Sequence, residues 1–476
     1  MRQASSDSTN SNSGISLRGK VDLGWLRGQV EQILEKNRVT EERNWNGYYQ
    51  ICTFHAPFLN PKIDYPPWLP SWLKQVWRMW WYFRLPWQVS YPHQWFWDSC
   101  GHAIVLSHID LKLAEAEIES LLYAQRGDGF IPHMVWNRRR MQWVDRLLQI
   151  LYPSRHTSPY IQPPALAEAV EHIYKESGDM EFVVGVLPRL KKYYLYLSKE
   201  RSRGEDGLLE IISSYESGKD RSSEYDLVYG ESNAKPVLQG PMFKLGRSHW
   251  KCGWNVDKIL AANRFRVKDL LVNCIYANNL SALSCLCQVA KDKEGEEFSR
   301  EKALKVEGSI LTKMYDNETG LFYSLDARYG EDKLIKVSTV SSLLTLVLDN
   351  ISQSQVERLV KNHLGNPEEF WLRYPVPAEP LNSGRAEVKG HIIWRGLQTW
   401  IYPNWYIFQG LRKQAQRFPQ HRQEYEMMAN EIVWRSYELI QKEGFCDFYH
   451  SQTGKGGAAS EFSLSTLILD MVYDLR

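Results

Sequence analysis

Four acidic residues in one short segment are the first group that could do acid–base chemistry. Within eleven residues around a glycine, the sequence places Glu216, Asp220, Glu224 and Asp226. If these side chains converged in a cleft, repulsion and loss of water would raise the pKa of at least one, as a general acid requires. The other interpretation is an acidic turn exposed to solvent. Spacing alone leaves both open.

Asp98 is a second candidate because it lies among aromatic residues. It follows Trp95 and Trp97 in a run of polar and aromatic residues at 91–100. A carboxylate there could hold sugar hydroxyls while the indole rings stack on the C–H face of the sugar. The alternative is a helix-capping aspartate in a tryptophan-rich core. Both stay open, since aromatic residues also fill cores and the chain has 19 tryptophans and 26 tyrosines.

Two later segments carry further polar and aromatic groups. Trp394 and Arg395 precede a glycine, and Trp400 follows closely. An arginine offers a rigid fork for hydroxyl or carboxylate oxygens. Asp447 lies among aromatic residues shortly after a glycine. The glycine-rich stretch at 453–457 lacks the spacing of a phosphate-binding loop.

Helical periodicity predicts the elements that must position these groups. Asp110 is expected to cap one helix, and Gly178 to end another that opens at Pro163. Apolar residues at helical spacing predict further helices around 182–194, 270–283, 427–439 and 462–475. Short segments dense in Trp, Pro, Gly, Asp and His lie between the helices, and strand alternation is scarce. Paired helices with such loops predict an all-α fold, a barrel of helical hairpins whose loops surround one mouth.

The composition is that of one large globular domain. Of the 476 residues, 43% are hydrophobic and 24% charged, and the formal net charge is +2. We therefore expect a sizeable core and no nucleic-acid partner. The seven cysteines are odd in number and lack metal-ligand spacing, which favours reduced thiols in the cytoplasm. No stretch reaches the roughly 20 apolar residues of a membrane span. The sequence leaves a homo-oligomer open.

The N-terminal part of the chain departs from this pattern. Residues 1–19 are polar and serine-rich and predict a disordered tail, whereas 20–476 predicts a single barrel domain. An aromatic-rich insert is expected at about 56–90, and the segment 66–97 holds eight of the 19 tryptophans. This segment could be a lid over the site, a hairpin packed on the barrel, or an interfacial helix on a membrane. We favour the first two and expect no membrane contact.

Read in order, these motifs resemble glycoside hydrolase family 63, especially its compact bacterial mannosylglycerate and glucosylglycerate hydrolases. The similarity runs from about residue 91 to the C-terminus. Each motif is weak alone, but together and in order they are specific. They are QWFWDSCGHA (94–103), DGFIPHM (128–134), QPPALA (162–167), ESGKD (216–220), YPVP (374–377), WRG (394–396), NW (404–405), GFCDFY (444–449) and TGKGG (453–457) before FSLSTL.

The resemblance implies a six-hairpin (α/α)6 barrel and inverting hydrolysis of an α-linked sugar, with no metal or organic cofactor. The ESGxD aspartate of such enzymes is the general acid, which carries over to Asp220. The acidic residue of the GFxEY-type motif is the general base, which carries over to Asp447. Glu216 and Asp226 are candidate neighbours that could raise the pKa of Asp220. The residues expected to hold the carbohydrate substrate are Trp95, Asp98, Gln162, Glu216, Trp394, Arg395 and Trp400.

Departures from the family pattern keep the substrate and the activity open. Relatives usually carry glutamate where this chain has Asp447, which is shorter by one methylene. The chain also reads WRGLQTWIYPNW at 394–405, where relatives often read WRGPxWxNxNW. Three functions therefore compete: hydrolysis of a glycosylglycerate, hydrolysis of another α-glucoside such as a disaccharide, and a catalytically weak sugar-binding or regulatory protein. Arg395 suggests a leaving group that bears a carboxylate. The arginine run at 138–140 could contribute to the same contact or could be a turn exposed to solvent.

Overall fold

The computed structural model describes residues 21–38, 70, 93–136, 149–235, 240–384 and 392–475. The predicted tail at 1–19 and the arginine run at 138–140 lie outside the described residues. So does the aromatic-rich insert at 56–90, apart from Pro70. Helices dominate the described part of the chain, and its strands are short.

Six helical elements form a closed inner ring. In order they are α3 (Phe96–Ser107), α6 (Leu166–Ser177), α11 (Leu270–Val289), the 3-10 helix η4 (Val340–Val347), α14 (Ile401–Arg417) and the 3-10 helix η8 (Ser463–Leu467). Each contacts the next, and η8 contacts α3 again, which closes the ring. Every residue of α3, η4 and η8 is buried. An element that is covered on all sides is mostly apolar, and its polar side chains need partners inside the protein, as in the 3.0 Å hydrogen bond between Ser463 and His102.

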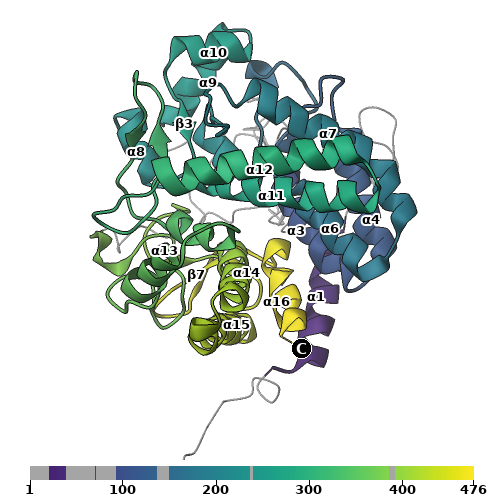
Figure 1. The fold of residues 1–476 in the computed structure, drawn as a ribbon, viewed down its shortest axis with the longest axis vertical. Coiled ribbons are helices and arrows are strands. Elements are labelled where there is room, and N and C mark those ends of the chain that lie inside the picture. Colours follow the sequence, from purple (N-terminus) through teal and green to yellow (C-terminus); the bar gives the residue numbers. More distant parts are fainter. Residues whose placement is uncertain are drawn as a thin grey trace, which may run out of the picture.

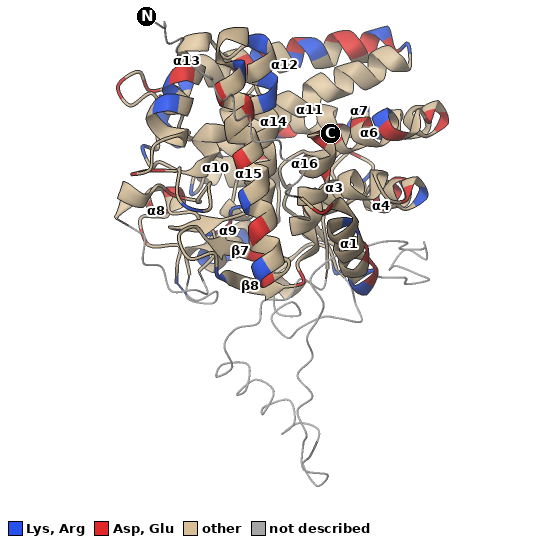
Figure 2. Cartoon of the chain, turned by 90° about the horizontal axis from the view of Figure 1, so that it is seen from below, with Lys and Arg blue, Asp and Glu red and all other residues tan. Residues whose placement is uncertain are grey.

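A second layer of helices surrounds the ring. Its members are α1 (Leu23–Asn37), α4 (Leu111–Tyr123), α7 (Met180–Glu200), α12 (Lys293–Lys313), α13 (Gln353–Arg358), the π-helical turn η5 (Leu359–Leu364), α15 (Arg422–Glu443) and α16 (Ile468–Asp474). Pairs such as α3 with α4, α11 with α12 and α14 with α15 are hairpins in direct contact (Figure 1). Charged residues are frequent on outer helices such as α12, whereas α11 contains none (Figure 2). The described residues thus form the predicted all-α (α/α)6 barrel.

Most of the predicted helix boundaries are confirmed. Asp110 caps α4 by accepting hydrogen bonds from the backbone N–H groups of Lys112 and Leu113. Gly178 ends α6 in the left-handed conformation. Two details are corrected. Met427, one of the apolar residues that predicted the helix at 427–439, lies on α15 but is 63% exposed, because it lies beside the apolar stripe of that helix. The expected last helix over 462–475 is divided into η8 and α16.

The two ends of the described chain meet in the barrel wall. Helix α1 (purple in Figure 1) packs on η8 and α16 (yellow). The Asn37 side-chain amide donates to the carbonyl of Glu461 at 2.7 Å, and an Arg27 guanidinium N–H donates to the Tyr473 hydroxyl at 3.0 Å. The N-terminal helix is therefore part of the barrel wall.

Helix α11 corrects one expectation about membranes. Among the described residues it alone is long and apolar enough to span a bilayer. Its most apolar window is 78% buried inside the protein, between α6, α12 and η4. The apolar character of this helix is therefore explained by its place in the inner ring.

Short sheets and helices connect the hairpins at one end of the barrel. The strands pair antiparallel in three sheets: β1 (Gln94–Trp95) with β2 (Met134–Val135); β3 (Val267–Lys268), β4 (Leu325–Asp326) and β5 (Lys333–Leu334); and β6 (Gln398–Thr399), β7 (Cys446–His450) and β8 (Gly456–Ser460). The short helices at this end are η3 (Ser214–Ser217), α8 (Glu224–Tyr229), α9 (Pro241–Lys251), α10 (Val256–Ala262) and η6 (Leu381–Ser383), whereas η7 (Pro419–His421) joins α14 to α15 within one hairpin. The candidate residues lie on or next to these connections.

Candidate active site

A pocket of about 590 Å³ opens at these connections and contains most of the predicted residues. Seven of the nine predicted site residues line it: Trp95, Asp98, Gln162, Asp220, Trp394, Trp400 and Asp447. The other two, Glu216 and Arg395, are not among its lining residues. Segments more than 300 residues apart in the chain thus contribute to one concave site, which the closed ring of helices makes possible.

Asp220 is presented by a tight turn after η3. Gly218 adopts a φ of +74°, and a Cβ at this position would lie 2.5 Å from the ring of Trp97, so only glycine fits without a shift. The side-chain amide of Asn233 donates to the carbonyl of Asp220 at 2.6 Å. Burial raises the pKa of the Asp220 carboxyl from 3.8 to about 7, and the nearby charge of Arg221 opposes this rise. Asp220 can therefore keep a proton near neutral pH, as a general acid must.

The acidic residues around Asp220 do not raise its pKa in the way the sequence suggested. Glu216 is fully buried and accepts two hydrogen bonds from the Arg201 guanidinium, at 2.6 and 2.9 Å. It also accepts from the backbone N–H groups of Ile161 and Ile212. The negative charge of the Glu216 carboxylate is thus compensated by Arg201, and its hydrogen bonds connect three segments of the chain. The expected effect of Glu216 on Asp220 is corrected: burial is the main cause of the shift.

Like Glu216, Arg395 forms an ion pair that connects segments of the chain near Asp220. Its guanidinium donates to both oxygens of Asp226, at 2.6 and 2.8 Å, and to the carbonyl of Arg221 at 2.7 Å. Because the negative charge of Asp226 is compensated by Arg395, Asp226 does not raise the pKa of Asp220 either. The Arg395 fork therefore holds the loop of the general acid. In this structure it does not face the pocket.

Asp447 comes from β7, at an irregularity of the third sheet. Cys446 pairs with Ser460 and Phe448 with Gly457. Asp447 alone lies between these pairs on β7, whereas two residues lie between them on β8. One of those two, Ala458, has a φ of +55°. Bulges of this kind re-aim side chains next to active sites. Asp447 is 1% exposed and lines the pocket.

Asp98 lies in the first turn of α3 and also lines the pocket. The N-cap of that helix is Trp95, so the capping interpretation of Asp98 is not supported. The pKa of Asp98 is raised from 3.8 to about 8, first by burial and then by the negative charges of Asp447 and Asp220. The pKa of Asp98 thus responds to both of the other carboxyl groups that line the pocket.

Aromatic rings form the remaining wall. Trp394 and Trp400 stack face to face, with ring centroids 3.9 Å apart and planes within 5°. Trp97 lies 6.3 Å from Trp394 and 4.8 Å from Tyr402. Trp394 has a φ of +63°, a conformation that is rare for a non-glycine residue and that concentrates at functional sites. Trp97 and Tyr402 were not predicted as site residues, although both lie inside the motifs.

Gln162 connects two walls of the pocket. Its side-chain oxygen accepts a hydrogen bond of 3.0 Å from the backbone N–H of Trp97, in the first turn of α3. Such groups at a helix N-terminus have no partner within the helix and need an outside acceptor. Gln162 thus helps to fix the turn that carries Asp98. Within the described residues, no group of three or more His, Cys, Asp or Glu side chains is arranged to hold a metal ion.

An all-helical barrel whose aromatic pocket is lined by three carboxyl groups is typical of one class of protein, the glycoside hydrolases that act from a helical barrel. A family model for the mannosylglycerate hydrolase MGH1-like glycoside hydrolase domain matches residues 91–465. The chain therefore belongs to this family, within glycoside hydrolase family 63, and is a glycosidase that hydrolyses O-glycosyl bonds.

Relatives of known function support this assignment. A glucosylglycerate hydrolase of Mycolicibacterium hassiacum is 31% identical over 369 residues, covering 66% of this chain and 79% of that protein. A mannosylglycerate hydrolase of Thermus thermophilus is 26% identical over 421 residues, covering 81% and 95%. The crystal structure of a family 63 mannosylglycerate hydrolase from Thermus thermophilus with glucose aligns with a TM-score of 0.73 at 22% identity, covering 94% of this chain and all of that one. This likeness shows that the fold is shared.

Proposed function

We propose that the protein hydrolyses a small α-glycoside with inversion, with Asp220 as general acid and Asp447 as general base. The observation that carries the proposal is the meeting of both carboxyl groups in one aromatic pocket, with the pKa of Asp220 raised to about 7. The family supports the reaction class, since the two relatives compared above are glycosylglycerate hydrolases.

In this scheme the two carboxyl groups have opposite protonation states. Asp220 donates its proton to the leaving oxygen as the glycosidic bond breaks. Asp447 removes a proton from a water that attacks the opposite face of the sugar, which requires the carboxyl groups to be about 6.5–9.5 Å apart. Asp98 and the aromatic wall hold the ring, so that binding energy orients the bond toward Asp220.

The substrate we favour within this class is a glycosylglycerate. Support comes from the relatives named above and from a solved Thermus thermophilus relative described in complex with Tris and D-glycerate. Arg395 does not add to this support, because its fork is already paired with Asp226. The arginine run at 138–140 lies outside the described residues. A comparison of an α-glycosylglycerate with the matching glycosylglycerol tests the preference, and equal rates would remove it.

The activity itself is tested by proton NMR on a panel of α-glucosides and α-mannosides. Inversion predicts that the β-anomer of the free sugar appears first and then mutarotates. Early appearance of the α-anomer would contradict the mechanism while leaving the glycosidase assignment intact. A second candidate, a catalytically weak sugar-binding relative, is favoured only by the shorter Asp447. Sugar binding without release of free sugar would identify it.

A further inference from the structure

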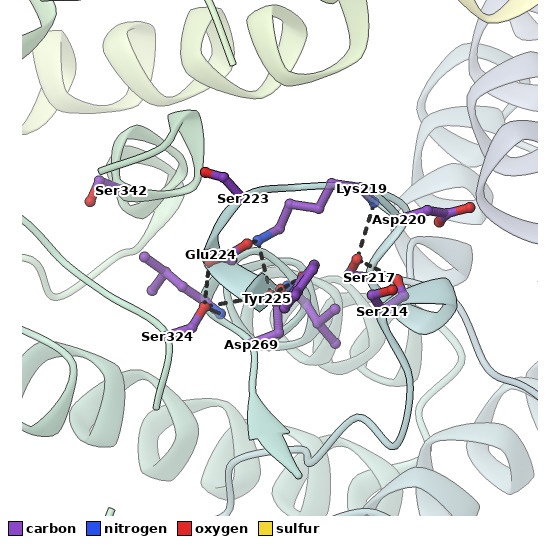
Figure 3. Close-up of polar contacts among 12 residues, drawn as sticks. Ser214, Ser217, Lys219, Asp220, Ser223, Glu224, Tyr225, Asp269, Ser324 and Ser342 are labelled. Carbon is purple, nitrogen blue, oxygen red and sulfur yellow. Dashed lines mark hydrogen bonds and ion pairs between the residues drawn. The ribbon is translucent and has the colours of Figure 1, made fainter. Parts of the chain in front are cut away.

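A buried lysine lies directly beside the general acid in the sequence. The Lys219 side chain is 1% exposed and leaves the chain in the opposite direction from that of Asp220 (Figure 3). Its ammonium group forms ion pairs with Glu224 and with Asp269, the latter at 2.9 Å. These two carboxylates are 2% and 0% exposed. The proposed mechanism uses none of the three.

The partners of Lys219 belong to elements that are fixed in the fold. Asp269 caps α11 of the inner ring by accepting from the backbone N–H of Val272 at 2.9 Å, and it also accepts from the Tyr225 hydroxyl at 2.7 Å. Glu224, in the first turn of α8, accepts from the Ser324 hydroxyl at 3.1 Å. The ammonium of Lys219 thus ties the turn before Asp220 to α8, α11 and the segment that leads into β4.

Two other side chains hold the end of the turn, since Asn233 donates to the carbonyl of Asp220 and Arg395 to that of Arg221. The backbone N–H of Lys219 donates to the Ser217 hydroxyl at 3.1 Å, which is a contact inside the turn. Gly218 packs on the Trp97 ring at a distance that leaves no room for a shift in that direction. The Lys219 side chain leaves the turn in the opposite direction from that of Asp220 and ends at Glu224 and Asp269, so its ion pairs oppose a displacement of the turn away from these carboxylates (Figure 3).

Stability alone is a weak explanation for this ion cluster. Burial lowers the pKa of Lys219 although Asp269 opposes this shift, so the ion pairs do not fully offset the loss of water. Buried ion pairs are often no more stabilising than apolar side chains of the same volume. What such a cluster does supply is a fixed direction, because a compact charge held between two anchored carboxylates has one favoured position.

We propose that Lys219 is a positioning residue for the general acid. Anchored by Glu224 and Asp269, it sets the turn at 217–220 so that the Asp220 carboxyl meets the leaving oxygen. This inference rests on the function proposed above for Asp220. It predicts a defect confined to proton donation, since the aromatic wall, Asp98 and Asp447 come from other segments.

The test compares Lys219→Met with the wild type on two classes of α-glycoside, one with an alcohol leaving group and one with an activated aryl leaving group. A misplaced acid harms the first class, which needs protonation, and spares the second. We expect kcat/KM to fall about 100-fold for the alcohol glycoside and less than about threefold for the aryl glycoside, with the change in kcat rather than KM. Asp220→Asn should show the same selectivity more strongly.

Two further variants separate positioning from folding. Lys219→Met/Glu224→Gln removes one positive and one negative charge together. If circular dichroism shows that Lys219→Met is unfolded, the kinetics of this double variant on the two substrate classes test the positioning role instead. Lys268→Met is the matched control, because Lys268 is also buried between two carboxylates, Asp206 and Asp332, at 2.7 Å each, outside the pocket lining. It should lower the melting temperature without changing leaving-group selectivity.

The outcomes distinguish this inference from the proposed function. An active wild type with folded Lys219 variants that lose both substrate classes equally, or lose neither, would overturn the positioning role alone. The same selective loss in Lys268→Met would also overturn it, by showing that any lost buried ion pair has this effect. A wild type that hydrolyses neither class would remove the proposed function and this inference together.

Discussion

At the residue scale, catalysis depends on how three carboxyl groups share one pocket. Burial raises the pKa of both Asp98 and Asp220, and the charges of Asp447 and Asp220 add to the effect on Asp98. Titratable groups whose surroundings push their pKa values apart are the usual sign of an acid–base pair. The three residues come from α3, the turn after η3 and β7, so their mutual distances depend on the whole barrel.

The raised pKa of Asp220 predicts the alkaline limb of the pH profile. The general acid works only while protonated, so kcat/KM should fall about tenfold per pH unit above its pKa of about 7. Asp220→Asn should abolish turnover of alcohol glycosides, and its residual activity on aryl glycosides should lack this limb. Steady-state kinetics over about pH 5–9 measure both. An Asn variant that keeps the limb would assign it to another group.

The proposed role of Asp447 as general base predicts opposite outcomes for two substitutions at this position. Asp447→Ala should reduce turnover by at least about 100-fold, because no other group is proposed to take the proton from water. Asp447→Glu should retain or improve activity, since relatives usually carry glutamate at this position. Kinetics of both variants on one substrate decide the assignment. A dead Glu variant beside an active wild type would mean that the bulge opposite Asp447 has adapted the site to the shorter side chain.

At the element scale, the turn at Gly218 predicts a specific cost. Gly218→Ala would place a methyl group 2.5 Å from the Trp97 ring at a φ of +74°, so both the turn and the indole must move. We expect kcat/KM to fall by about 10- to 100-fold as Asp220 shifts. Gly178→Ala is the matched control, because its φ is +66° but no atom lies within 4 Å of the added methyl. It should lose stability and keep activity.

The elements also show what could be predicted from the sequence. Caps and periodicity located α4 and α6, because these signals act within a few residues. The partners of Glu216 and Arg395 could not be predicted, because Arg201 and Asp226 are separated from them by 15 and 169 residues. The sequence of an acidic segment does not show whether its carboxylates face solvent, a pocket or an arginine. The family resemblance predicted most of the residues that line the pocket, whereas the ion pairs of Glu216 and Arg395 could be identified only in the folded structure.

At the scale of the whole molecule, the two layers of the barrel also bury an acidic side chain outside the pocket. Glu117 on α4 is 0% exposed, and burial raises its pKa from 4.5 to about 8. It lies outside the pocket lining, and the sequence analysis did not single it out. In the folded protein this carboxyl keeps its proton to a higher pH than in the unfolded chain. Its effect on stability therefore depends on pH.

The sign of that dependence follows from proton linkage. Below about pH 4.5 both states hold the proton, and between about pH 4.5 and 8 only the folded state holds it, so the free energy of unfolding falls as pH rises. Glu117→Gln removes this titration. Each pKa unit is worth about 1.4 kcal/mol, so the stability gain of the variant should grow by a few kcal/mol between about pH 5 and 9. Activity should stay unchanged.

Thermal or denaturant unfolding of both proteins across this pH range measures the difference. The control is Glu119→Gln on the same helix, whose side chain is exposed and which should alter stability little at any pH. A Glu117→Gln variant whose advantage stays constant or shrinks with rising pH would show that this carboxyl is ionised in the folded protein. Its neighbours Ser99 and Gln94, which favour the charged form, would then outweigh burial.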